Sequence, residues 1–149
     1  METTNRKLVD QLEEILEKNR DAQKGYAKAA DKADSPQLQN YFRRKSTDRM
    51  QFNEKLKREL VATYDEIDDD GSFSGTIHRA WMDIKSLFGD TDESMLEEAI
   101  RGDKAAVEEY EEVLEEKALP AKVAAIIRDQ HMKIRTDLNE IKSLEDLKD

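Results

Sequence analysis

The stretch that decides the fold is residues 65–91, which read DEIDDDGSFSGTIHRAWMDIKSLFGDT. It contains three of the five Gly and the only Trp of the chain. Its first half is acidic and rich in Gly and Ser, which interrupts a helix, whereas apolar residues in its second half recur at helical spacing. We therefore expect a crossover segment with a short helix at residues 76–88, in which His78 and Trp81 pack onto the rest of the fold.

On either side of this stretch the sequence predicts a pair of long helices joined by a tight turn. Ser35 can cap a helix that has Pro36 at its first position, and Pro120 opens a helix in the same way. Asp90 or Thr91 can cap the helix that follows the crossover, with Glu93 in capping-box spacing from Asp90. The long helices are expected at residues 4–33, 36–64, 92–117 and 120–144.

Each long helix has one apolar stripe with steps that alternate between four and three residues, which is typical of a bundle seam. The first stripe consists of Leu8, Leu12, Ile15, Asn19, Ala22, Tyr26, Ala29 and Ala33. Helices of roughly 25–30 residues are about 40 Å long. A connection as long as residues 65–91 can run back along that whole length, which a tight turn cannot do. The sequence thus predicts a ferritin-like four-helix bundle, in which two antiparallel helix hairpins are joined by one long crossover.

Composition limits the class of protein. The chain has 149 residues, of which 37% are hydrophobic and 40% charged, and this suits a single domain, residues 1–149, of long amphipathic helices. A net charge of −10 disfavours binding to nucleic acid and to anionic membranes. There is no Cys for a disulfide or thiolate site. No apolar run has transmembrane length and the start lacks a signal-peptide core, so we expect a cytoplasmic protein.

Polar residues interrupt each apolar stripe at similar heights. They are Asn19, Lys45, Asp48, Arg49, Asp103, Gln130 and Asp137. Because buried polar groups need partners, we expect a polar layer in the middle of the core, with Arg49 paired to Asp103. Tyr26 follows Asn19 by seven residues and Tyr110 follows Asp103 by seven, so both tyrosines are expected in the core beside the layer.

The polar layer has two interpretations. In the first it is a self-satisfied network of hydrogen bonds and ion pairs that sets the helix register. In the second, Asp48, Asp103, His131 and Asp137 form an unusual metal site for iron or another divalent ion. The Glu-x-x-His motif of di-iron bundles is absent from the sequence, and Lys45 and Arg49 would repel a cation.

Several short motifs are arranged as in one known family. They are Gly25-Tyr26-x-x-Ala29-Ala30, Arg49-x-x-Phe52, Leu56, Gly71-Ser72-x-x-Gly75-x-x-His78-Arg79-x-Trp81-Met82-Asp83-x-Lys85, Leu96-Glu97, Arg101-Gly102-Asp103, Tyr110, Leu119-Pro120 and Gln130-x-x-x-Ile134. In these motifs, which span nearly the whole chain, the sequence resembles the DUF2383 family, a domain of unknown function in the ferritin-like superfamily. The resemblance implies a ferritin-like fold and self-association, and it implies no known reaction.

Three functions follow as expectations. The first is a noncatalytic bundle without a cofactor that forms a homo-oligomer, a dimer or larger, and acts as an interaction or stress-related accessory protein. The alternative is a metal-binding ferritin-like protein with a degenerate di-iron-like site. The third is a binder of a small ligand near Tyr26 and Tyr110. No catalytic residue is suggested by spacing.

Overall fold

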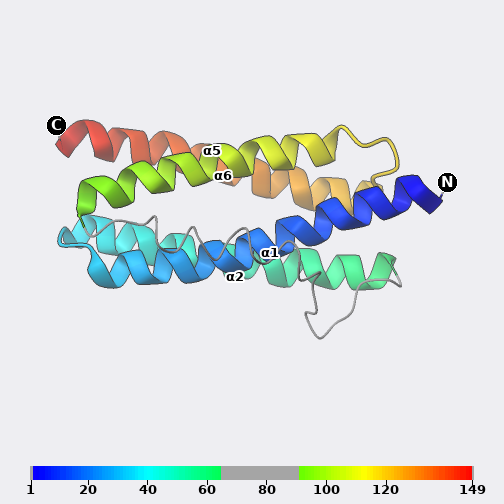
Figure 1. Ribbon diagram of the computed structural model, residues 1–149, viewed down its shortest axis with the longest axis horizontal. Helices are drawn as coiled ribbons and strands as arrows, with labels where there is room; N and C mark the ends of the chain where they lie inside the picture. The colour runs from blue at the N-terminus through cyan, green and yellow to red at the C-terminus, as the bar shows by residue number, and fades with distance from the viewer. Residues whose placement is uncertain (1, 65–90, 149) are drawn as a thin grey trace.

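The computed structural model describes residues 2–64 and 91–148, and among them the side chains of residues 6–64 and 91–141. This part of the chain is an all-helical bundle of α1 (Glu2–Lys32), α2 (Pro36–Thr63), α5 (Asp92–Leu114) and α6 (Ala121–Lys148), without strands. In Figure 1, α1 and α2 lie side by side and run in opposite directions, and so do α5 and α6. The short helix expected at residues 76–88, with His78 and Trp81, lies outside the described residues.

The turn between α1 and α2 is fixed by local chemistry and by a distant carboxylate. Ser35 is the N-cap of α2, its hydroxyl accepts a hydrogen bond from the Leu38 amide at 3.4 Å, and Pro36 opens the helix as predicted. Asp92, at the start of α5, adds two contacts that the sequence did not suggest. Its carboxylate accepts hydrogen bonds from the amides of Asp34 at 2.8 Å and Ser35 at 3.0 Å. The start of α5 is thereby attached to the α1–α2 turn.

The ends of α5 and α6 differ from the predicted ones. Thr91 caps α5, but the capping box is completed by Ser94 and not by Glu93. The helix ends at Leu114 instead of residue 117, because the backbone then tightens into turns before Pro120, which disfavours helical geometry in the residue that precedes it. At the other end, α6 continues past the predicted residue 144 to Lys148.

Replacing Asp92 with alanine is expected to lower the free energy of unfolding by about 1–3 kcal/mol, because two amides at a part-buried turn lose their acceptor. Urea denaturation followed by circular dichroism measures the change. Glu93, the exposed neighbour on the same helix, is the control, and its alanine variant should stay within about 0.5 kcal/mol of the wild type. Equal losses in the two variants would contradict the role given to Asp92.

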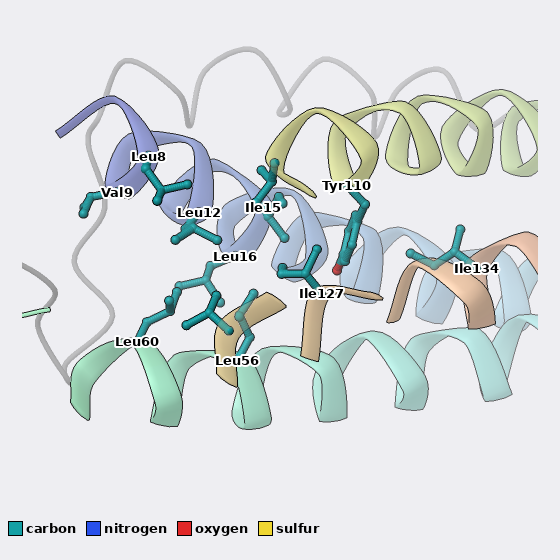
Figure 2. Close-up of a cluster of buried hydrophobic side chains, with 12 residues drawn as sticks. Leu8, Val9, Leu12, Ile15, Leu16, Leu56, Leu60, Tyr110, Ile127 and Ile134 are labelled. Atoms are coloured by element: carbon teal, nitrogen blue, oxygen red, sulfur yellow. The ribbon is translucent and has the colours of Figure 1, made fainter. Parts of the chain in front are cut away.

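The described core consists of two apolar clusters. The first lies toward the start of α1 and comprises Leu8, Val9, Leu12, Ile15, Leu16, Leu56, Leu60, Tyr110, Val113, Val123, Ile127 and Ile134 (Figure 2). The second lies toward the α1–α2 turn and comprises Tyr26, Ala29, Ala30, Ala33, Leu38, Tyr41, Phe42, Met95, Leu96, Ala99 and Ile141. Buried polar and charged side chains fall between these clusters in sequence on every helix. None of the described helices is long and apolar enough to cross a membrane.

Candidate functional site

Asp103 is the centre of the polar layer. It lies on α5 with no exposed surface, and both of its carboxylate oxygens are engaged. Oδ1 accepts hydrogen bonds from the Arg49 guanidinium at 2.8 Å and from the Tyr26 hydroxyl at 2.9 Å, and Oδ2 accepts one from Lys45 Nζ at 2.8 Å. Asp103 thus joins two cations of α2 and a phenol of α1 within the core.

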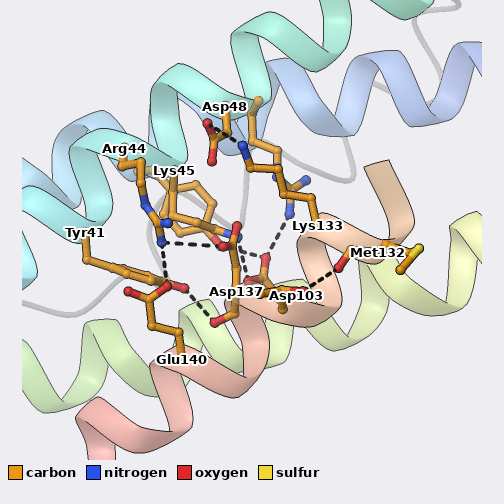
Figure 3. A network of polar contacts seen from close by, with 12 residues as sticks. Tyr41, Arg44, Lys45, Asp48, Asp103, Met132, Lys133, Asp137 and Glu140 are labelled. Carbon is orange, nitrogen blue, oxygen red and sulfur yellow. Dashed lines mark hydrogen bonds and ion pairs between the residues drawn. The ribbon is translucent and has the colours of Figure 1, made fainter. Parts of the chain in front are cut away.

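A second carboxylate, Asp137 of α6, shares the Lys45 ammonium. Lys45 Nζ lies 3.2 Å from Asp137 Oδ2, so the cation is shared by two acids (Figure 3). The same Nζ lies 5.3 Å from the centre of the Tyr26 ring, which adds an aromatic face to its surroundings. Asp137 Oδ1 lies 3.4 Å from Arg44, which also donates a hydrogen bond to Glu140 at 2.9 Å. Since Arg44 and Glu140 are exposed, this branch runs from the core to the surface.

The other branch crosses the bundle through amides and a phenol. Arg49 donates to Asn19 Oδ1 at 2.6 Å, and the Asn19 amide donates to the Tyr110 hydroxyl at 2.9 Å. Tyr110 in turn donates to Gln130 Oε1 at 2.8 Å, and the Gln130 amide donates to the Phe52 carbonyl at 3.1 Å. The network therefore includes residues from all four described helices, and these buried donors and acceptors satisfy one another.

The two pairs predicted from the seven-residue spacing are joined crosswise. Tyr26 of α1 bonds Asp103 of α5, while Asn19 of α1 bonds Tyr110 of α5. This arrangement follows because α1 and α5 run in opposite directions, so the later residue on one helix meets the earlier residue on the other (Figure 1). Both hydroxyls are thereby used inside the network.

Burial sets the protonation states in the layer. It raises the pKa of Tyr110 to about 12 and raises the pKa of Tyr26 well above its ordinary value, where the negative charge of Asp103 adds to the effect. Burial opposes the charge on Arg49, but Asp103 and the two tyrosines together outweigh it, and the pKa of the guanidinium is raised. At neutral pH the phenols are therefore neutral hydrogen-bond donors, and Arg49 is a cation.

The four residues of the proposed metal site do not converge. Asp103 and Asp137 come together, but the Lys45 ammonium lies between them. Asp48 lies instead toward Lys133, with Oδ1 3.5 Å from its Nζ, and His131 lies 3.1 Å from Glu111. No group of three or more His, Asp or Glu side chains within the described residues is placed to hold a metal ion.

The charge of the layer also opposes a metal ion. Each unit of positive charge placed about 4 Å from Lys45 would be repelled by about 4 kcal/mol at an effective dielectric constant of about 20. Arg49 would add to this repulsion, since it contacts the same carboxylate. The donor set around Asp103 thus fits the side-chain cations of α2 and does not fit a divalent metal.

The match to a protein family covers most of these residues. A family model described as a domain of unknown function, DUF2383, matches residues 7–116. The chain belongs to the DUF2383 family. The matched part of this DUF2383 protein includes Asn19, Lys45, Arg49 and Asp103, whereas Gln130 and Asp137 of α6 lie beyond it. No curated protein matches the chain.

Sequence reasoning missed several polar residues of the DUF2383 protein. Tyr41 packs edge-on against Phe42 with ring centres 5.7 Å apart, and its hydroxyl donates to the Asp137 carbonyl at 3.1 Å. Arg44 lies over the Tyr41 ring at 5.2 Å. Tyr41 lies one helical turn before Lys45 on α2, and residues three and four apart share a helix face. This spacing could have predicted that Tyr41 belongs to the polar layer.

Proposed function

We propose that this DUF2383 protein is a noncatalytic, cytoplasmic bundle of ferritin-like connectivity that self-associates and serves as an interaction or stress-related accessory protein. One observation carries the proposal. Asp103, the most deeply buried acid of the layer, has both oxygens engaged by Arg49, Lys45 and Tyr26. A carboxylate held in this way stabilises the bundle and is not available as a base or a metal ligand.

The ferritin-like connectivity is supported by the directions of the helices. The end of α2 and the start of α5 lie at opposite ends of the bundle in Figure 1. Residues 65–90 must therefore connect positions separated by the length of a helix, which is about 40 Å for α2. The self-association part rests on the resemblance to the family.

Metal analysis separates this proposal from the metal-binding alternative. The purified protein is incubated with iron, manganese or zinc, desalted, and analysed by mass spectrometry of the elements. We expect substoichiometric metal in the wild type and the same amount in His131→Ala and Asp137→Asn. One or two retained ions per chain that are lost in both variants, but kept in the surface control Glu97→Ala, would contradict the proposal.

Light scattering over a range of protein concentrations tests self-association. The average mass is expected to rise above that of one 17.3 kDa chain as the concentration increases. A constant mass of one chain would contradict self-association and would leave the structural role of the layer unaffected.

A further inference from the structure

The buried charges that meet between the two helix pairs are sorted by sign. Two buried cations of the described helices, Lys45 and Arg49, come from α2, and the acids that they contact, Asp103 and Asp137, come from α5 and α6. Figure 3 shows Lys45 with these two acids. The α1–α2 pair therefore contributes positive charge to this contact and the α5–α6 pair contributes negative charge. Neither pair could bury its own charged residues favourably without the other.

The same sorting holds around the rim of the contact. Lys18 of α1 pairs with Glu109 of α5, and Lys7 lies 3.6 Å from Glu116, just after α5. Arg44 of α2 pairs with Glu140 of α6. The pair of Asp48 and Lys133 has the opposite orientation, and it lies at the edge of the layer with Lys133 half exposed.

The two halves of the sequence also differ in total charge. Residues 1–64 contain 14 Lys and Arg against 11 Asp and Glu, a formal charge of +3. Residues 91–149 contain 9 Lys and Arg against 17 Asp and Glu, a formal charge of −8. Surfaces of opposite potential attract each other and surfaces of like potential repel, so the charges favour pairing of unlike halves.

The uncharged hydrogen bonds favour the same pairing. The Asn19 amide of α1 needs the Tyr110 oxygen of α5, and the Gln130 amide of α6 needs the Phe52 carbonyl of α2. Two copies of the α1–α2 pair placed face to face would bring their buried cations together without Asp103 and Asp137. Such unpaired buried charges discriminate strongly against the wrong partner.

We propose that the α1–α2 pair and the α5–α6 pair are mutually selective halves, and that the α1–α2 face of one chain accepts the α5–α6 face of a second copy. The resulting dimer exchanges halves, so that each bundle contains Lys45 and Arg49 from one chain and Asp103 and Asp137 from its partner. This inference rests on the proposed self-association and names its partner and its interface.

Concentration decides which pairing dominates. The two halves of one chain are joined by 26 residues, and tethering two binding faces through a short connection gives an effective concentration on the order of 1 mM. At about 50 μM of protein, pairing within one chain is then favoured over exchange by about 20-fold. The exchanged dimer of the wild type should therefore increase with concentration and should form best when unfolded chains refold together.

Complementation between two full-length variants tests the proposal. The first variant, Lys45→Met with Arg49→Met, leaves Asp103 without a cation and Asp137 with the exposed Arg44 alone. The second, Asp103→Asn with Asp137→Asn, removes the acids that the two cations contact. Each variant alone buries uncompensated charge, which lowers a folding equilibrium more than about a hundredfold. In an exchanged dimer of the two, one bundle has all four wild-type charges and the other has none.

The variants are unfolded in urea, mixed in equal amounts and refolded together, and the products are weighed by native mass spectrometry. We expect a dimer with one chain of each kind, at least tenfold more abundant than either dimer of identical variants. Its helical content should exceed the mean of the separately refolded variants. The bundle with all four wild-type charges is sufficient to hold this dimer together. The result therefore does not require the other bundle, which has none of these four charges, to fold.

The alternative outcomes are distinct. A mixture that contains no mixed dimer would overturn the exchange of halves, whether or not the separate variants fold. If the wild type still forms oligomers in that case, self-association uses another surface. If the mixed dimer forms while the wild type stays monomeric up to high concentration, the selectivity of the halves is supported and the proposed self-association fails.

Discussion

Replacing Asp103 with alanine is expected to lower the free energy of unfolding by about 3–5 kcal/mol, because it leaves buried cations without their shared acid. Arg49 loses the carboxylate with which it pairs in the core, and Lys45 keeps the longer contact to Asp137. This loss is a large fraction of the total stability of a typical domain, which is about 5–15 kcal/mol. Urea denaturation followed by circular dichroism measures it.

The controls for the Asp103 variant separate charge from packing. Glu97 is exposed on the same helix, and Glu97→Ala should change stability by less than about 0.5 kcal/mol. The double variant Asp103→Leu with Arg49→Met should lose less free energy of unfolding than the sum of the losses in the two single variants. Each single variant leaves one partner of the ion pair buried and unpaired, whereas the double variant removes both partners. A loss below about 1 kcal/mol in Asp103→Ala would show that the carboxylate does not hold the layer together.

Stability is expected to fall steeply as the pH rises above about 10, the pKa of tyrosine in an unfolded chain. Burial raises the pKa of Tyr110 to about 12, and it also raises the pKa of Tyr26 and of Tyr41 well above the ordinary value. Above pH 10 the unfolded chain therefore releases phenol protons that the folded chain retains, which favours unfolding. Below pH 10 both states keep these protons and the effect vanishes.

Each buried phenol contributes about 1.4 kcal/mol per pH unit, so three acting together contribute about 4 kcal/mol per unit. Lys18 adds an effect of the same sign, because its two glutamate partners outweigh burial and raise its pKa. Urea denaturation in a series of alkaline buffers measures the slope, and the tyrosinate absorbance of these three of the four tyrosines should appear as the helices unfold. Tyr110→Phe should reduce the slope by about 1.4 kcal/mol per pH unit, the contribution of one phenol proton. An unchanged slope would contradict the contribution given to Tyr110.

Much of the polar layer could be predicted from sequence because its members interrupt apolar stripes. Lys45 and Arg49 occupy stripe positions of α2, and the structure places both at Asp103. Asp48 and His131 lie one position away from their stripes. Since one residue turns a helix by about 100°, their side chains point to the flanks, where each has its own partner.

Other parts of the layer depend on how far the helices slide along each other. Periodicity identifies the face of a helix but leaves this longitudinal register open. Tyr41 donates a hydrogen bond to the Asp137 carbonyl, and Lys45 contacts Asp137, only because α2 and α6 pack in one longitudinal register. Hydrogen bonds require that position to within a few tenths of an ångström.

The sequence by itself determined the helices, the tight turn at Ser35 and Pro36, and the presence of polar residues on the inward faces. These features depend on neighbours within one or two turns, so local propensity and spacing suffice to predict them. Only the tertiary structure decided that Asp92 holds the α1–α2 turn and that Tyr26 meets Asp103 while Asn19 meets Tyr110. These contacts join residues far apart in the chain, and their geometry is set by the packing of the whole bundle.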